Sequence, residues 1–171
     1  MGNEKLKNIN ELYIKYNNDL YNFIFLMIRD NEQAKDLMHD TFLQAYKKFD
    51  SFKDENVKSW LYKIARNLTI DYIRRRKPMS FFFDLTDVHS NIKGTEQIVT
   101  LNESEKELYL ALAKLKRKYQ QVIILRKIKE FTIKETSEIL GCTEAKVKTN
   151  LLRGMKQLKK ELEKEGYHHG I

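Results

Sequence analysis

A chain of 171 residues with a net charge of +8, a single cysteine and no long apolar run excludes several classes of protein. Cys142 cannot form an internal disulfide, and no segment approaches the roughly 18–20 apolar residues that a membrane span requires. The first residues also lack the apolar stretch of a secretory signal, so we expect a reduced, cytoplasmic protein without direct membrane insertion.

The positive charge is divided between two segments of the chain. Residues 1–78 hold 15 basic and 11 acidic side chains, and residues 106–171 hold 16 basic and eight acidic ones. Residues 79–105, between them, hold one lysine and five acids. Two basic segments indicate a polyanionic partner, usually nucleic acid, although a lysine-rich surface that is merely solvated is the alternative.

Helical periodicity dominates the first part of the chain. Asp30 with Gln33 resembles a capping box, residues 50–57 form a polar loop, and Pro78 ends the last helix of this part. The sequence therefore predicts a helical domain over residues 5–78. Apolar residues recur at three- and four-residue steps in three segments of it: 9–27, 34–49 and 61–72.

Residues 79–104 show no clear period and are predicted to be a linker. The aromatic run Phe81-Phe82-Phe83 is unusual in such a segment, since linkers rarely expose three large rings. Packing onto the first domain and docking onto a partner both remain open as its role.

A second domain is predicted over residues 105–165, with four helices. Ser104 and Glu107 resemble a capping box at its start, and a tail follows over residues 166–171, where His168-His169 is more typical of a frayed end than of a metal site. The fold class is therefore all-α, with two small helical domains joined by a linker. The last helix is predicted to carry five residues inward: Val147, Leu151, Met155, Leu158 and Leu162.

A helix-turn-helix pattern lies inside the second domain. Ser137 is small enough for two helices to cross closely, Gly141 suits the left-handed turn, and Val147 anchors the second helix. Thr132 with Glu135 caps the first of these helices. The second helix of such a motif enters the DNA major groove, although any two packed helices with a glycine turn can mimic the pattern. Its outer face and start are predicted to carry Thr143, Glu144, Ala145, Lys146, Lys148, Thr149, Leu152, Arg153 and Lys156.

The helix near residue 60 combines aromatic and basic side chains. Its predicted inward face is Leu61, Ile64, Ala65 and Leu68. Aromatic rings beside cations suit unstacked bases, because the rings stack on the bases and the cations hold the backbone. A half-buried tryptophan and basic residues that complement the helix dipole are the structural alternative. The predicted outer face and basic end carry Trp60, Lys63, Asn67, Asp71, Arg74, Arg75, Arg76 and Lys77.

The order of these pieces resembles the bacterial RNA polymerase sigma factors of the extracytoplasmic-function (ECF) group of the sigma-70 family. Residues 36–46, DLMHDTFLQAY, resemble that family's core-polymerase-binding helix. The −10-element segment is matched by Phe49-Asp-Ser-Phe52, Trp60-Leu61 and residues 64–75. The −35-reading domain is matched by residues 122–126, 138–143 and 147–148. Three positions depart from the family pattern, His39, Ser137 and Ala145-Lys146, and the last leaves the −35 sequence undetermined.

The resemblance implies a role for each part of the chain. The linker would lie near the RNA-exit channel of the polymerase, and an anti-sigma protein, often membrane-bound, would hold the factor inactive. Core RNA polymerase would be contacted by Leu37, Asp40, Thr41, Phe42, Ala45 and Tyr46. Melted non-template −10 DNA would be bound by Phe52, Lys58, Trp60, Lys63, Asn67, Asp71, Arg74, Arg75 and Arg76. The −35 duplex would be read by Thr143, Glu144, Ala145, Lys146, Lys148, Thr149, Arg153 and Lys156.

Two other kinds of protein compete with this interpretation. A stand-alone helix-turn-helix regulator would need a dimer to pair its half-sites, and the sequence offers no obvious dimer element. An adaptor-like interaction protein would leave the basic outer face of the last helix without a role. An enzyme is disfavoured because no Cys/His pair, glycine-rich phosphate loop or His-Glu-x-x-His pattern occurs. Asp36 and Asp40 share a helix face, but without a base or ligand set nearby they indicate no catalytic residue, metal site or cofactor.

Overall fold

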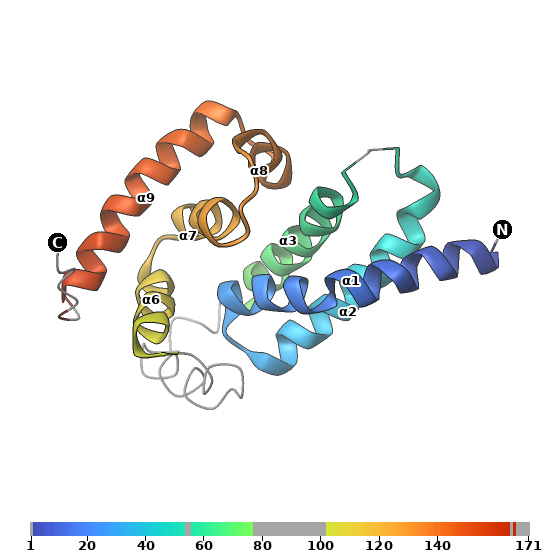
Figure 1. Ribbon diagram of the computed structural model, residues 1–171, viewed down its shortest axis with the longest axis horizontal. Coiled ribbons are helices and arrows are strands. Elements are labelled where there is room, and N and C mark those ends of the chain that lie inside the picture. The colour runs from blue at the N-terminus through green and yellow to red at the C-terminus, as the bar shows by residue number, and fades with distance from the viewer. Residues whose placement is uncertain (1, 54–55, 77–101, 165, 167–171) are drawn as a thin grey trace. The chain divides into compact units, whose positions relative to one another are not determined.

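The structure is a computed structural model that describes residues 2–53, 56–76, 102–164 and 166. All of the described elements are helices, and they form two compact units, one built on α1 to α3 and the other on α6 to α9 (Figure 1). The all-α fold predicted from the sequence is confirmed. Most of the predicted linker, Pro78, Phe81-Phe82-Phe83 and the two tail histidines lie outside the described residues.

The first unit begins with two long helices that pack along each other. Helix α1 spans Gly2–Ile28 and α2 spans Asn31–Lys48, with only Arg29 and Asp30 between them. The Asp30 carboxylate accepts a hydrogen bond from the Gln33 backbone N–H at 3.1 Å, which is one of the two bonds of the predicted capping box. The chain leaves α1 at Arg29, whose φ is 53°, and the Asp30 cap then fixes where α2 begins.

Helix α3 spans Val57–Arg76 and packs against both α1 and α2, after the short helix η1 at Phe49–Ser51 (Figure 1). Leu61, Ile64 and Ala65 are buried as predicted, whereas Leu68 is only half-buried. Tyr62 is also fully buried, with its ring centroid 5.1 Å from that of Phe23. This burial raises the pKa of the Tyr62 phenol far above its ordinary value, so the side chain is neutral in the folded protein.

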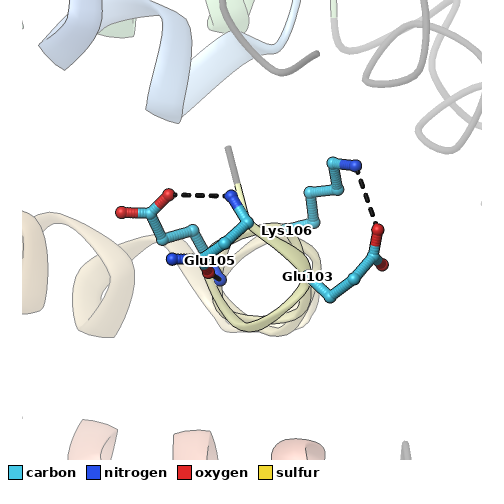
Figure 2. A network of polar contacts seen from close by, with 4 residues as sticks. Glu103, Glu105 and Lys106 are labelled. Atoms are coloured by element: carbon cyan, nitrogen blue, oxygen red, sulfur yellow. Dashed lines mark hydrogen bonds and ion pairs between the residues drawn. The ribbon is translucent and has the colours of Figure 1, made fainter. Parts of the chain in front are cut away.

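The second unit begins with α6, Glu103–Lys114, and here the predicted cap was wrong. The capping box is formed by Asn102 and Glu105 instead of Ser104 and Glu107. The Asn102 side chain accepts from the Glu105 N–H at 2.9 Å, and the Glu105 carboxylate accepts from the Asn102 N–H at 3.1 Å (Figure 2). Asparagine is at least as good an N-cap as serine, and starting there also places Glu103 in the first turn, where it favours the helix dipole.

Helix α7 spans Arg117–Ile123 and continues into one π-helical turn, η2, at Ile124–Ile128. Helix α9 spans Glu144–Lys164 and packs against α7 and α6. The core of this unit is formed by Ala111, Leu112, Leu115, Ile123 and Leu158. Within the described ranges, none of the helices combines the length and the hydrophobicity of a membrane span.

The buried stripe of α9 differs from the predicted one. Met155 was expected to point inward but is 38% exposed, and Gly154 and Asn150 are buried in its place. A Cβ at Gly154 would lie 3.0 Å from the Tyr119 Cβ and 3.1 Å from the Ile123 Cδ1. The absence of a side chain at Gly154 thus lets α9 approach α7 closely, and this rotates Met155 away from the core.

Candidate nucleic-acid interface

The helix-turn-helix is formed by α8, Ile133–Leu140, a glycine turn and α9. A complete capping box begins α8: the Thr132 hydroxyl accepts from the Glu135 N–H at 3.1 Å, and the Glu135 carboxylate accepts from the Thr132 N–H at 2.7 Å. Gly141 ends the helix in the left-handed conformation, with φ of 64°, and both its N–H and that of Cys142 donate to the Ser137 carbonyl. A Cβ at Gly141 would meet no atom within 4 Å, so the backbone conformation, and not space, requires glycine there.

Helix α9 starts immediately after this turn and presents a basic outer face. The Thr143 hydroxyl caps it by accepting from the Lys146 N–H at 3.2 Å. Val147, Gly154 and Leu158 hold the opposite side against the core. All eight residues that the sequence assigned to the −35 element are exposed: Thr143, Glu144, Ala145, Lys146, Lys148, Thr149, Arg153 and Lys156.

No acidic side chain among the described residues pairs with the cations of this face. Within the part of the chain that the structure describes, Lys146, Lys148, Arg153 and Lys156 form neither an ion pair nor a side-chain hydrogen bond. Such cations are free to neutralise phosphates, and the start of α9 adds the positive end of the helix dipole.

In the first unit, the predicted −10 residues gather around the start of α3. The rings of Phe52 and Trp60 stack with centroids 4.4 Å apart and planes inclined by 29°. Both rings are half-buried, so each keeps a surface open to solvent. The Asn56 side chain accepts from the Ser59 N–H at 3.0 Å and caps α3, a bond that the sequence analysis missed inside the polar loop.

The remaining −10 candidates lie along α3. Lys63, Asn67, Asp71, Arg74, Arg75 and Arg76 are exposed, and Lys58 is half-buried. The Asn67 amide oxygen accepts from the neighbouring Arg66 guanidinium at 3.3 Å, which leaves the amide nitrogen directed away from this bond. Phe52, Trp60 and Asn67 thus come from one loop and one helix, as the sequence predicted.

Arg76 differs from Arg74 and Arg75 because it has partners within the unit. Its guanidinium donates to the Tyr72 hydroxyl at 2.5 Å and lies 3.6 Å from the Asp30 carboxylate that caps α2. Burial raises the pKa of Tyr72 above its ordinary value, and the nearby Arg76 acts in the opposite direction. An exposed pair of this kind is worth no more than about 1 kcal/mol, so DNA could displace it.

Another contact, which no local sequence signal indicated, holds the loop that carries Phe52. The Lys5 ammonium lies 2.6 Å from the Asp50 carboxylate and 4.7 Å from the centre of the Tyr46 ring. The start of α1 is thereby tied to the end of α2 and to η1. Asp50 is largely exposed, so the pair orients the loop more than it stabilises the fold.

Comparison with known proteins decides the family. Two family models match the chain: "Sigma-70 region 2" over residues 12–78 and "Sigma-70, region 4" over residues 105–158. The chain is 33% identical over 159 residues to the ECF RNA polymerase sigma factor SigX of Bacillus subtilis, covering 89% of this chain and 82% of SigX. It is 34% identical over 153 residues to SigM of the same organism, covering 88% of this chain and 93% of SigM.

This chain belongs to the ECF group of the sigma-70 family. Solved structures of similar fold include the sigma factor RpoE in complex with the anti-sigma factor NepR from Bartonella quintana. That structure has a TM-score of 0.73 and 24% identity, covering 92% of this chain and 98% of that one. CnrH in complex with the cytosolic domain of CnrY has a TM-score of 0.68 and 20% identity, covering 92% and 89%.

Most of the α2 residues that the sequence assigned to core polymerase are buried in this sigma factor. Of the six residues assigned to core polymerase, only Asp40 is exposed, and Tyr46 is half-buried beneath Lys5. The other four are buried in the first unit: Leu37, Thr41, Phe42 and Ala45. The Thr41 hydroxyl, for example, donates to the Leu37 carbonyl at 2.7 Å within the helix.

The exposed side of α2 instead carries Asp36, His39, Asp40 and Leu43, of which Leu43 is 59% exposed. His39 is half of a local pair, since its ring stacks on that of Tyr13 and its Nε2 lies 3.3 Å from the Tyr13 hydroxyl. Among the residues that the structure describes, no group of three His, Cys, Asp or Glu side chains could hold a metal ion.

Proposed function

We propose that this sigma factor divides promoter recognition between its two units, with the exposed side of α2 binding core RNA polymerase. The Phe52–Trp60 pair and the polar side of α3 would hold melted non-template DNA of the −10 element. Helix α9 would read the −35 element as duplex. The observation that carries this proposal is the row of exposed cations along α9, the second helix of a complete helix-turn-helix, which have no ion-pair partner among the described residues.

Two weak contacts made by one protein explain why the polymerase is needed. Each unit alone presents a small surface, and its DNA contacts are screened by salt. When core polymerase fixes both units at once, the second contact becomes intramolecular and its effective concentration rises. A stand-alone regulator with the same helix-turn-helix would have no use for the exposed side of α2 or for the stacked pair at α3. We propose no catalytic role for the chain.

Regulation by a protein partner is part of the proposal. RpoE and CnrH, which share this fold, were each solved with a partner, NepR and the cytosolic domain of CnrY. A comparable anti-sigma protein would keep this factor from polymerase. Because bacterial RNA polymerase acts in the cytoplasm, we expect this factor to act there too.

Run-off transcription tests the proposed function. Purified core polymerase is incubated with fragmented DNA from the source genome, with and without this protein. We expect discrete transcripts that depend on the protein, and their start sites would reveal both promoter elements. If active core neither binds the protein nor produces such transcripts, the proposal is wrong and the stand-alone regulator takes its place.

The cations of α9 are expected to act through phosphates. Changing Lys146 and Arg153 together to glutamine should weaken −35-dependent transcription at all promoters and lower the slope of log affinity against log salt by about 1.8, at ~0.9 per phosphate contact. Binding to core polymerase should not change, because these residues lie outside the first unit. Holoenzyme affinity for a promoter duplex, measured from 50 to 200 mM salt, checks both expectations.

The matched control removes two lysines from α1, Lys7 and Lys15, both exposed and neither assigned to DNA. This variant makes the same change in net charge, so an equal loss of affinity and slope in it would show that total charge, and not the α9 face, controls binding.

A further inference from the structure

One exposed residue of α9 has the wrong chemistry for a surface that only binds phosphate. Leu152 is 61% exposed, although leucine favours the interior. It belongs to neither the core nor the set of cations, and nothing in the described part of the chain covers it. The position of Leu152 around the α9 axis indicates what this side chain would contact.

Four exposed residues spaced four, three and four apart share the outermost line of α9, opposite Val147, Gly154 and Leu158. We call this line the central stripe. It consists of Ala145, Thr149, Leu152 and Lys156. The first three present hydrocarbon: a methyl group, the methyl group of a threonine, and an isobutyl group. If α9 enters the major groove as proposed, the central stripe points at the base edges.

Cations stand on both sides of this stripe. Lys146 and Arg153 lie along one flank and Lys148 along the other, and all three are exposed and unpaired within the described ranges of the chain. A groove with phosphates on its two rims and apolar groups on its floor would match that pattern. An apolar protein segment over Leu152 would instead have to bring carboxylates for each of the flanking cations, which makes DNA the better fit.

The side chains that read purines are missing from the centre of the stripe. Guanine is read by arginine or lysine and adenine by asparagine or glutamine. In α9, Asn150 is buried on the core side and Gln157 is half-buried off the stripe, so neither amide lies on the line. Lys156 is the one charged residue of the central stripe and lies at its C-terminal end. The major groove contains one apolar base group, the C5 methyl of thymine.

We propose that α9 reads the −35 duplex through thymine C5 methyl groups, with Leu152 as the main contact and Thr149 and Ala145 beside it. This rests on the proposed function, since it needs α9 to lie in the major groove. The specificity of the −35 element would then come from hydrocarbon contact at A·T pairs, and the flanking cations would supply affinity without sequence information.

Uracil in place of thymine removes only the C5 methyl group and tests this directly. The probe is a promoter duplex mapped from the protein's own transcripts, with each −35 thymine replaced singly by uracil, and the readout is −35-dependent open-complex formation by holoenzyme. Loss of one buried methyl group should reduce open-complex formation about fourfold at the contacted position. Leu152→Ala should cause a similar loss on the thymine duplex and then show no further loss with uracil.

Leu6→Ala is the matched control, because Leu6 is 55% exposed on α1 and belongs to no proposed contact. This variant should keep the full fourfold response to uracil. The proposal is overturned if wild-type holoenzyme tolerates uracil at every −35 thymine, or if Leu152→Ala keeps the wild-type response. It is also overturned if Leu152→Ala transcribes normally but no longer binds an inhibitory protein, since the stripe would then be a protein-docking surface. Absence of promoter-dependent transcription by the wild-type protein is a distinct result, and it would defeat the proposed function itself.

Discussion

Replacing Phe52 with alanine is expected to slow promoter opening roughly 5- to 150-fold while leaving the binding of core polymerase unchanged. Base stacking on an aromatic ring is worth ~1–3 kcal/mol, and each 1.36 kcal/mol is a factor of ten in rate. The Phe52 ring is stacked on Trp60, so its removal loses one platform and also the support of the other. The −35 contacts would come from the other unit, and the closed complex should therefore still form.

Permanganate reactivity of unpaired thymines, followed over time on a promoter with holoenzyme, measures this effect. The matched variant is Phe52→Tyr, which keeps the ring and its stack on Trp60 and should open the promoter at close to the wild-type rate. Equal opening rates for Phe52→Ala and the wild-type protein, with core binding intact, would show that the pair is only structural. A loss of core binding in Phe52→Ala would show that the division of roles between α2 and α3 is wrong.

Local sequence patterns were enough to predict most of the fold. Threonine at 132 followed by glutamate at 135 predicted a capping box, and both of its hydrogen bonds form. Gly141 was predicted to be left-handed, and its φ is 64°. These features depend on residues within one helical turn of each other, so the sequence alone contains the information. The capping of α6 was wrong because Asn102 and Ser104 are both good caps and no local rule separates them.

Features that depend on a second helix were predicted less well. The 3.6-residue period permits either Met155 or Gly154 on the inner face of α9, and the close approach of α7 decides between them. The same reason explains Tyr62, which the predicted inward face of α3 did not include and which is buried against Phe23 of α1. The ion pair between Lys5 and Asp50 spans 45 residues and has no counterpart in any local pattern.

Predictions for the candidate site divide in the same way, into those that one helix decides and those that depend on its surroundings. On α9, every residue assigned to the −35 element is exposed, because one face of a single helix follows from its period. On α2, resemblance to the family selected a motif as a whole, and a motif contains residues that shape the helix as well as residues that touch a partner. Leu37 and Phe42 are buried and shape the helix, whereas Asp40 is exposed and so is available to a partner. Their roles in binding remain predictions for the transcription experiments.

Replacing Gly154 with valine is expected to destabilise the second unit by about 2–3 kcal/mol. The nearest atom to the new Cβ would be the Tyr119 Cβ at 3.0 Å, which is fixed to the α7 backbone and cannot turn aside. The Ile123 Cδ1 at 3.1 Å is the tip of a flexible chain, but Ile123 is itself buried and has little room to move. Overpacking of a well-filled core costs ~1–3 kcal/mol, and the two γ-methyl groups of valine place this case at the upper end.

Two spectroscopic signals separate the units in the intact chain. Trp60 is the only tryptophan and lies in α3, so its fluorescence reports the first unit, whereas far-ultraviolet circular dichroism reports helices of both. In Gly154→Val we expect the dichroism transition to gain an earlier step at lower denaturant while the tryptophan midpoint stays in place. Gly2→Val is the control, because a Cβ at Gly2 meets nothing within 4 Å. A wild-type dichroism curve for Gly154→Val would show that α9 can move away from α7 at no cost.

The size of the residue at 154 should matter more than the loss of glycine. Alanine gains ~1 kcal/mol of helix propensity over glycine, which opposes the cost of its single Cβ, so Gly154→Ala should change the free energy of unfolding far less than Gly154→Val. Ile123→Ala removes one of the two crowding groups, and combined with Gly154→Val it should cost less than the sum of the single changes. Because the same contact orients α9, −35-dependent transcription should fall in Gly154→Val and recover partly in the double variant. Strict additivity of the two costs would mean that the valine is accommodated elsewhere and that the close crossing of α7 and α9 does not set the direction of the reading face.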